Sequence, residues 1–290
     1  MSVTVHAPAK INLTLDIVGI RADGYHLLES LFQSVSIYDT VVATPAEVGD
    51  ISLTVAGDAC DCPVEKNTAY KAAKVFFEAT GIEGGVHLTL TKRIPQQAGM
   101  GGGSADAAGV LWALNTLYEA NLTTSRLHRM GAKIGADVPF CVVGGTVMVT
   151  GIGDGLADWG AMPQCHIVVA QPAEGISTKE AYAAVDNATI TRRPDHEAVK
   201  LALCQRDLHA LCEQAINVFE DATELAGVKD IRRRMEAFHP LCSQMTGSGS
   251  CVFAIFEDAD TAKACVEELK TTYPIAFVCK PCDGVIIEKE

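Results

Sequence analysis

A glycine-rich segment at residues 95–108 carries the clearest chemical signal in the sequence. It reads PQQAGMGGGSADAA and places Gly99, Gly101, Gly102 and Gly103 within five positions, with Ser104 next. Glycine lets backbone N–H groups approach a ligand closely and adopts positive φ. An alternating segment precedes this loop and an amphipathic helical pattern follows it, so the start of the helix offers unpaired amides and the positive end of its dipole. The segment therefore predicts an anion site, most naturally for phosphate.

Two common phosphate-binding motifs do not fit this loop. A Walker loop ends in Gly-Lys-Ser/Thr, and the segment contains no lysine. A dinucleotide-binding loop requires a third glycine where Ser104 stands. A flexible glycine linker is the structural alternative, but the adjoining strand and helix patterns favour a phosphate site. The Ser104 hydroxyl could then contact a phosphate oxygen or Mg²⁺.

A lysine and an aspartate elsewhere in the chain could act on a phosphoryl group held by this loop. Lys10 lies on the polar face of an alternating segment, beside Asn12, and Asp137 follows a predicted helix. Taken alone, such residues are most often a solvated lysine and a turn or capping aspartate.

The composition is that of a globular protein with a sizeable core. Of 290 residues, 48% are hydrophobic and 20% charged, and 23 basic against 36 acidic residues give a net charge of −13. This charge argues against binding to nucleic acid or to anionic membranes. No stretch approaches the ~20 apolar residues of a membrane span, and the first ten residues lack a signal-peptide pattern, so we predict a cytoplasmic protein.

Eleven cysteines are spread along the chain without the spacing of a disulfide framework. Most stand in apolar runs, where a free thiol packs as a small hydrophobic group, so we expect reduced, buried thiols. Cys60 and Cys62 form one close pair, and Cys279 and Cys282 form another. A zinc site that joins the two pairs remains a minor alternative.

Periodicity predicts the elements that must position these residues. Strand patterns occupy residues 11–17, 27–42, 50–56, 86–94, 140–150, 251–256 and 275–279. A helix pattern occupies residues 67–80, with Asn67 as the cap at its start and Gly81 just beyond its end. Further helix patterns occupy the segment after the glycine loop and residues 124–135, 178–184, 195–203, 208–219, 228–238 and 259–271. The pattern lapses near residues 157–163, so we predict two domains, residues 1–160 and 161–290.

Three motifs in order resemble the GHMP small-molecule kinases. The glycine loop is similar to the family's phosphate loop, P-x-x-x-G-[LM]-G-[GS]-S-[SA]. Residues 7–13 (APAKINL) resemble its opening motif, and residues 246–250 (TGSGS) resemble its third motif. The resemblance implies an α/β (α+β, two-layer) fold: an N-terminal ribosomal-protein-like domain with a left-handed crossover, and a ferredoxin-like C-terminal domain. It also implies ATP as co-substrate, with Mg²⁺ held mainly by its phosphates and no dedicated metal site.

Three further segments narrow the resemblance within the family. Residues 21–26 (RADGYH), 31–33 (LFQ) and 135–139 (GADVP) are similar to those of members that phosphorylate a cytidylyl sugar alcohol in non-mevalonate isoprenoid synthesis. A GHMP kinase for homoserine, mevalonate or galactose is the alternative, and a non-catalytic nucleotide-binding module is a more distant one. The expected partners are small molecules, without nucleic acid or membrane, and the expected state is a monomer or weak homodimer.

The resemblance also implies a role for each site residue. Lys10 corresponds to the catalytic lysine and Asp137 to the catalytic base. Tyr25 and Tyr182 would stack on a cytosine ring while His26 bonds its polar edge. The other expected substrate contacts are Asn12, Phe32, Thr178 and Lys179. The expected ATP contacts are Pro95, Gln96, Gln97, Ala98, Gly99, Met100, Gly101, Gly102, Gly103, Ser104 and Ala105. Ala105 departs from the family, which often has a second serine there, so the hydroxyl role rests on Ser104.

Overall fold

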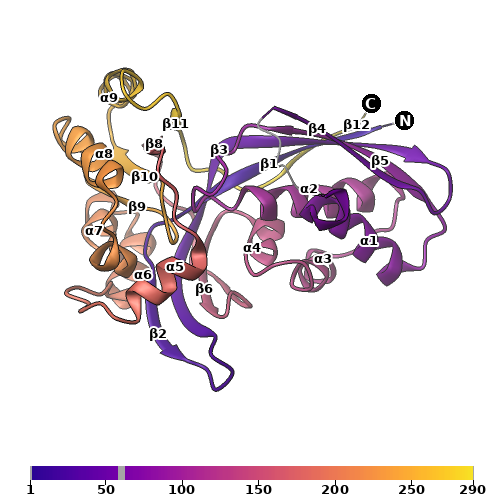
Figure 1. Ribbon diagram of the computed structural model, residues 1–290, viewed down its shortest axis with the longest axis horizontal. Helices are drawn as coiled ribbons and strands as arrows, with labels where there is room; N and C mark the ends of the chain where they lie inside the picture. Colours follow the sequence, from indigo (N-terminus) through magenta and orange to yellow (C-terminus); the bar gives the residue numbers. More distant parts are fainter. Residues whose placement is uncertain (1, 58–62, 290) are drawn as a thin grey trace.

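The computed structural model describes residues 2–57 and 63–289 of the chain, and their strands form two sheets (Figure 1). The first sheet contains β1 (Val3–Asn12), β2 (Asp16–Ile20), β3 (His26–Ala46), β4 (Ile51–Gly57), β5 (Gly85–Lys92), β6 (Thr146–Gly151), β7 (Gly155–Asp158) and β12 (Ile286–Lys289). Its order is β12-β1-β3-β5-β4, with β2 and β6 also paired to β3, and β7 paired to β6. The strands β4 and β5 run parallel.

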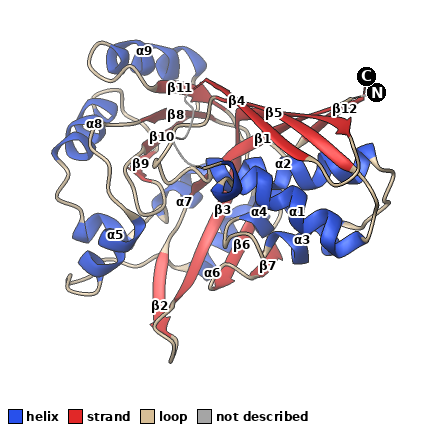
Figure 2. Cartoon of the chain, turned by 45° about the vertical axis from the view of Figure 1, so that its right-hand side comes forward, coloured by secondary structure: helices blue, strands red, loops and turns tan. Residues whose placement is uncertain are grey.

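One face of the first sheet is covered by helices (Figure 2). These are α1 (Thr68–Thr80), α2 (Gly102–Leu117), α3 (Thr124–Gly131) and α4 (Val138–Val143), and the short 3₁₀ helix η1 (Val64–Lys66) precedes α1. The predicted helix at residues 67–80 is confirmed together with its end signals. The Asn67 side chain accepts a hydrogen bond from the Ala69 N–H at 2.9 Å, and Gly81 ends the helix with φ 68°.

The second sheet has the order β11-β8-β10-β9 and is antiparallel. Its strands are β8 (His166–Ala170), β9 (Cys242–Met245), β10 (Val252–Phe256) and β11 (Ala276–Cys279). Numbered along the chain, this order is 4-1-3-2, which is the ferredoxin-like arrangement. The expected ferredoxin-like second half is therefore confirmed.

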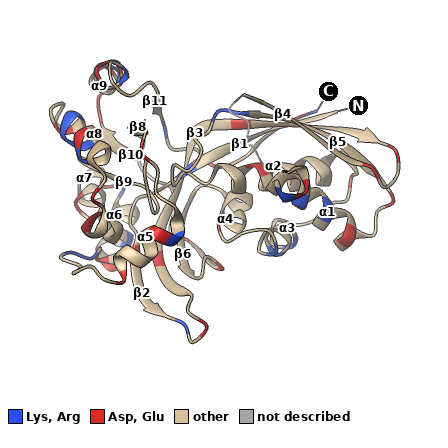
Figure 3. Cartoon of the chain, viewed as in Figure 1, with Lys and Arg blue, Asp and Glu red and all other residues tan. Residues whose placement is uncertain are grey.

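Helices pack on both faces of the second sheet, so alternate residues of its central strands belong to different cores. Ile167 and Val169 belong to the core shared with the first sheet, whereas Val168 and Ala170 belong to a second core. The helices of this half are α5 (Thr178–Val185), α6 (His196–Gln205), α7 (Leu208–Glu213), η2 (Val218–Ala222), α8 (Ala226–Glu236) and α9 (Ala259–Lys270). Basic and acidic residues lie close together along α8 (Figure 3), where Arg232 pairs with Glu236 and Arg234 pairs with Asp230.

The predicted strand at residues 140–150 is wrong in its first part, which forms the helix α4. The apolar run from Phe140 to Val143 has the composition of a strand, but Pro139 in the first turn favours a helix start. Gly144, with φ 72°, then ends the helix before β6 begins. Because α4 is buried on most sides, it lacks the polar face that would identify a helix by periodicity.

The predicted strand at residues 11–17 is wrong in its middle, because pairing along β1 stops at Asn12 and β2 begins at Asp16. Its polar face is buried: Lys10, Asn12, Thr14 and Asp16 are each at most 6% exposed. Alternation alone cannot distinguish a polar face in solvent from one buried against the second half of the chain. The helices predicted at residues 124–135 and 208–219 are shorter, ending at Gly131 and Glu213.

Several strands were not predicted, and one of them, β12, ties the two halves together. The strands β8 and β9 supply half of the second sheet, and β12 returns from the end of the chain to pair with β1. Leu15 also forms a bridge with Asn217.

The division of the chain into two domains at residue 160 stays a prediction. Cys60 and Cys62 lie outside the described residues, and in the described parts no three His, Cys, Asp or Glu side chains gather as a metal site. No helix among the described residues is long and apolar enough to span a membrane.

Candidate active site

A cavity of about 1350 Å³ opens where the glycine loop, β1, α4 and α5 meet. Every predicted site residue lines it except Ala105, which is fully buried within α2. The lining predicted residues are Lys10, Asn12, Tyr25, His26, Phe32, Pro95, Gln96, Gln97, Ala98, Gly99, Met100, Gly101, Gly102, Gly103, Ser104, Asp137, Thr178, Lys179 and Tyr182. The fold thus brings together segments that lie up to 172 positions apart in the sequence, from Lys10 to Tyr182.

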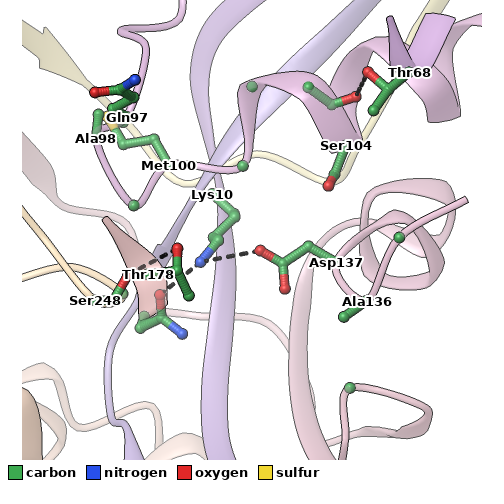
Figure 4. Close-up of a pocket in the computed structure, with 18 of the residues that line it drawn as sticks. Lys10, Thr68, Gln97, Ala98, Met100, Ser104, Ala136, Asp137, Thr178 and Ser248 are labelled. Atoms are coloured by element: carbon green, nitrogen blue, oxygen red, sulfur yellow. Dashed lines mark hydrogen bonds and ion pairs between the residues drawn. The ribbon is translucent and has the colours of Figure 1, made fainter. Parts of the chain in front are cut away.

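Lys10 points from β1 into this cavity between the glycine loop and Asp137 (Figure 4). Its Nζ donates to Asn12 Oδ1 at 2.8 Å and lies 3.4 Å from Asp137 Oδ2. The ammonium also lies over the Phe32 ring, 4.6 Å from the centroid. Since the side chain is only 5% exposed, these contacts hold the charge in one place with little competition from water.

Asp137 occupies the N-cap position of α4 but does not cap the helix. Its side chain makes no capping hydrogen bond, and it is 35% exposed. The carboxylate is therefore available to the cavity and to Lys10, unlike that of an ordinary capping aspartate. An acid within reach of both solvent and an ammonium can accept a proton from an alcohol bound beside it.

The glycine loop is held against β1 and against the third motif. Lys10 N–H donates to Met100 O at 3.0 Å, and a Cβ added to Gly101 would lie 3.1 Å from Lys10 Cγ. Gly99, with φ 70°, lies so close to the third motif that a Cβ there would be 2.2 Å from Thr246 O. Side chains at these glycines would push the loop away from Lys10 and Thr246, so the close packing explains the glycines directly.

The start of α2 lies where the sequence predicted an anion site. Gly101 has φ 72° at the N-cap position and has no side chain to cap the helix, and Gly102 and Gly103 of the first turn line the cavity. Ser104 lies on this wall, and Thr68 from α1 donates to Gly103 O at 2.6 Å (Figure 4). Basic side chains also line the cavity, namely Lys10, Arg21, Lys66, Lys92 and Lys179, so a phosphate meets local positive charge despite the net charge of −13.

Part of the cavity wall carries aromatic and imidazole rings. His26 stacks on Tyr182 with centroids 4.5 Å apart, and its Nε2 lies 2.7 Å from Asp186 Oδ1. Burial, together with the charge of Asp137, raises the pKa of Tyr182 to about 12, so its hydroxyl stays neutral. Tyr25 is 62% exposed, with Arg21 over its ring at 5.5 Å. This part of the wall offers flat apolar faces beside polar ring atoms, which suits a nucleobase.

A buried charged cluster below the glycine loop was not predicted. Lys92 Nζ donates to Asp106 Oδ2 at 2.6 Å and to Asp39, which is fully buried and also accepts from the Ile94 N–H at 2.9 Å. Burial raises the pKa of Asp106 to about 8, an effect that Lys92 only partly offsets and that Asp39 reinforces. Asp39 lies 53 positions from Lys92, so no local motif could have revealed the cluster.

Other lining residues were missed because each is unremarkable in its own segment. They include Leu15, Leu28, Val55, Lys66, Asn67, Thr68, Leu90, Ile94, Ala132, Ile152, Gly153, Asp154, Ala183, Asp186, Phe219, Gly247 and Ser248. Ser248 stands inside the third motif, and its Oγ donates to Thr178 Oγ1 at 3.5 Å. The motif itself was the signal that could have placed Gly247 and Ser248 at the site.

Known proteins match this chain along nearly its whole length. The family model described as GHMP kinases N terminal domain matches residues 67–145, and that described as GHMP kinases C terminal matches residues 198–275. A relative from Clostridium tetani, 4-diphosphocytidyl-2-C-methyl-D-erythritol kinase, is 38% identical over 279 residues, which is 95% of this chain and 99% of the relative. The relative of that name from Carboxydothermus hydrogenoformans is 42% identical over 281 residues, 96% of each chain.

Solved structures give the same grouping. A crystal structure of 4-(cytidine 5'-diphospho)-2C-methyl-D-erythritol kinase has a TM-score of 0.81 and 35% identity, with coverage of 96% of this chain and 98% of that chain. A homoserine kinase from Cytophaga hutchinsonii has a TM-score of 0.77 at 19% identity, with coverage of 99% and 97%, which shows a shared fold. The resemblance predicted from the motifs is confirmed, and the chain belongs to the 4-diphosphocytidyl-2-C-methyl-D-erythritol kinase family of the GHMP kinases.

Proposed function

We propose that this protein transfers the γ-phosphoryl group of ATP to the 2-hydroxyl of 4-(cytidine 5'-diphospho)-2-C-methyl-D-erythritol, a step of non-mevalonate isoprenoid synthesis. The observation that carries the proposal is the contact between Lys10 and Asp137, 3.4 Å apart, beside a glycine loop at a helix start. The His26–Tyr182 stack lines the same cavity, so a phosphate site and a ring site would share one cavity.

In this proposal Asp137 is the general base. The substrate hydroxyl would lie beside its exposed carboxylate and lose its proton as the oxygen attacks the γ-phosphorus. Lys10 would stabilise the negative charge on the transferred group, because its ammonium is held at the cavity wall by Asn12. The amides of the glycine loop and of the first turn of α2 would hold the other phosphates in place.

The part of the cavity lined by these rings would bind the cytosine. Tyr182 is fixed by its packing on His26 and on Phe219, whose ring centroid is 5.0 Å away, so it offers a preformed face. Tyr25 would cover the opposite face, since its exposed ring is free to settle on a base. Stacking accepts any base, so the His26 ring must provide the choice of cytosine through hydrogen bonding.

We also propose that Mg²⁺ enters with ATP. Ser104 places a hydroxyl on the wall beside the glycine loop, and this is the kind of oxygen ligand that Mg²⁺ takes alongside phosphate oxygens. When bound, the ion would neutralise part of the phosphate charge. The cytoplasmic location and the monomeric or weakly dimeric state also remain predictions, which cell fractionation and sedimentation would check.

A phosphorus NMR assay of the purified protein tests the function. With ATP, Mg²⁺ and the cytidylyl substrate, we expect a new phosphomonoester signal to grow as ADP forms. Homoserine, mevalonate and galactose should give no such signal at the same concentrations. Phosphorylation of one of those alcohols, with the cytidylyl compound inert, would assign the protein to another GHMP activity. Binding of ATP with no transfer to any alcohol would favour a non-catalytic nucleotide-binding module.

A further inference from the structure

We infer that Ser30 and Thr246 are positioning residues, which fix the Asn12 side-chain amide so that its oxygen faces Lys10. The inference rests on the proposed catalytic role of Lys10. An asparagine amide has nearly the same shape in either orientation, but the two orientations differ in polarity. With the oxygen toward Lys10 the amide accepts from the ammonium, whereas a flipped amide would direct its own N–H groups at that charge.

The hydroxyl of Ser30 determines which atom of the Asn12 side-chain amide lies next to it. Ser30 Oγ donates its only proton to Thr14 O, so it can act only as an acceptor toward Asn12. Asn12 Nδ2 lies 2.9 Å from that oxygen and donates to it. In the flipped orientation two oxygens without a proton between them would face each other. Ser30 is fully buried, so no solvent can relieve this conflict.

The hydroxyl of Thr246 likewise determines that the oxygen of the Asn12 amide, and not its nitrogen, lies next to it. Thr246 Oγ1 accepts from the Asn12 backbone N–H at 2.9 Å, which leaves its proton free to donate. Asn12 Oδ1 lies 3.3 Å away and receives that proton. Thr246 begins the third motif, so a residue from the second half of the chain helps to orient a group on β1.

The orientation matters because Asn12 is the shortest contact of the Lys10 ammonium. The Nζ to Oδ1 distance is 2.8 Å, against 3.4 Å to the nearest carboxylate oxygen of Asp137. Asn12 is 1% exposed and Lys10 is 4% exposed, so an inverted amide would repel a charge that has few other partners. Ser30 and Thr246 therefore act on the reaction through Asn12, without touching the substrate.

A double-mutant cycle tests whether Ser30 acts through Asn12. We expect Ser30→Ala to lower kcat about 10- to 100-fold, with KM for both substrates changed less than about threefold, because misplacing a catalytic group slows chemistry. In an Asn12→Ala background the same substitution should have no further effect on kcat. Ser36→Ala is the matched control, because it removes a hydroxyl from the same strand. The Ser36 hydroxyl accepts a hydrogen bond from Lys280 N–H, and its loss should keep wild-type kcat.

Neutron diffraction of the wild-type protein gives an independent reading, even where Ser30→Ala fails to fold. We expect two deuterons on the Asn12 atom that faces Ser30 and none on the atom that faces Lys10. The opposite assignment, or additive losses in the double mutant, would overturn the inference. Lys10→Ala separates a failure of this inference from a failure of the proposed function. Full turnover in Lys10→Ala removes Lys10 from the mechanism. If Lys10→Ala is inactive but Ser30→Ala keeps wild-type kcat, only the role of Ser30 is rejected.

Discussion

At the scale of single residues, the Lys10 ammonium is shared between a neutral amide and a carboxylate. Asn12 accepts from it at 2.8 Å, and Asp137 lies at 3.4 Å with a third of its side chain open to the cavity. The two acceptors differ in what they can do next. Asn12 is buried and positions the charge, whereas in the proposed mechanism Asp137 would also take a proton from the bound alcohol.

We predict that Asp137→Asn lowers kcat by about 100- to 10,000-fold and leaves both KM values nearly unchanged. The amide keeps the size of the carboxylate but cannot accept the proton, and the glycine loop and ring pocket are untouched. Steady-state kinetics with both substrates measure the effect. Lys10→Ala should also lower kcat, and the double mutant should lose less than the product of the two because paired groups act together. Full turnover in Asp137→Asn would exclude it as the base.

Tyr25 is exposed, so its substitution tests binding without disturbing the core. We predict that Tyr25→Ala raises KM for the cytidylyl substrate about tenfold or more and leaves KM for ATP unchanged, because stacking on a base is worth about 1–3 kcal/mol. Ile20→Ala is the control, since Ile20 is 60% exposed, ends the neighbouring strand β2, and does not line the cavity. Equal increases in both KM values would assign Tyr25 a general structural role instead.

At the scale of elements, the glycine loop lies directly on the stem of Lys10. We predict that Gly101→Val weakens ATP binding at least about tenfold, since Gly101 has φ 72° and an added Cβ would lie 3.1 Å from Lys10 Cγ. Gly49→Val is a matched control: its φ of 86° is equally unfavourable for valine, but no atom lies within 4 Å of the added Cβ. Calorimetry should show ATP binding lost in the first variant and kept in the second. Unchanged affinity in Gly101→Val would contradict the phosphate-loop role.

The buried cluster below the loop predicts a pH dependence of stability. Two carboxylates share Lys92, and burial, reinforced by the nearby charge of Asp39, keeps the proton on Asp106. The pKa of Asp106 is about 8 in the folded protein and near 4 when unfolded, so the folded state binds a proton that the unfolded state releases. The free energy of unfolding therefore falls as pH rises from about 4 to about 8, by up to about 1.4 kcal/mol per pH unit.

We predict that Asp106→Asn removes this slope, because an amide has no proton to release. Urea unfolding of both proteins between pH 5 and pH 8 measures the contribution of Asp106 as the difference between their plots of unfolding free energy against pH. Asp260→Asn, at an aspartate that is 90% exposed, should leave the slope of the wild-type protein in place. Parallel curves for the wild-type protein and Asp106→Asn would show that Asp106 is ionised throughout this range.

At the scale of the whole molecule, the site exists because the second sheet is anchored to the end of β1. Gln244 on β9 donates from Nε2 to Asn12 O at 3.1 Å and to Leu13 O at 2.8 Å, and it is 1% exposed. These carbonyls lie where β1 stops pairing with β3, so few other donors are available to them. Gln244 thus connects the half that carries the glycine loop to the half that carries the third motif.

We predict that Gln244→Leu lowers the free energy of unfolding by about 1–3 kcal/mol, since it leaves two buried carbonyl groups unsatisfied. Gln171→Leu is the control, because Gln171 donates to Gln96 O at a solvent-exposed position and its loss should cost about 0.5 kcal/mol or less. Urea unfolding measures both. Equal losses would mean that Gln244 contributes no more than a surface hydrogen bond.

The sequence by itself determined the features that depend on neighbouring residues. The cap at Asn67, the glycine stop at Gly81 and the loop-to-helix transition at Gly101 follow from backbone preferences over a few positions, and the structure has each of them. The order of the motifs was enough to identify the family, which the relatives confirm. Sequence reasoning failed at α4, where an apolar run buried on most sides leaves no periodicity to separate helix from strand.

Only the tertiary structure decided which polar residues are buried and which of them meet. Asn12 receives its orientation from Ser30, 18 positions away, and from Thr246, 234 positions away. Lys92 pairs with Asp39 across 53 positions, and Asp137 comes within 3.4 Å of Lys10. A local pattern indicates whether a residue favours a strand or a helix. Burial and charge pairing depend instead on the surface that packs against that strand or helix. That surface comes from other parts of the chain, so it is defined only when the two sheets come together.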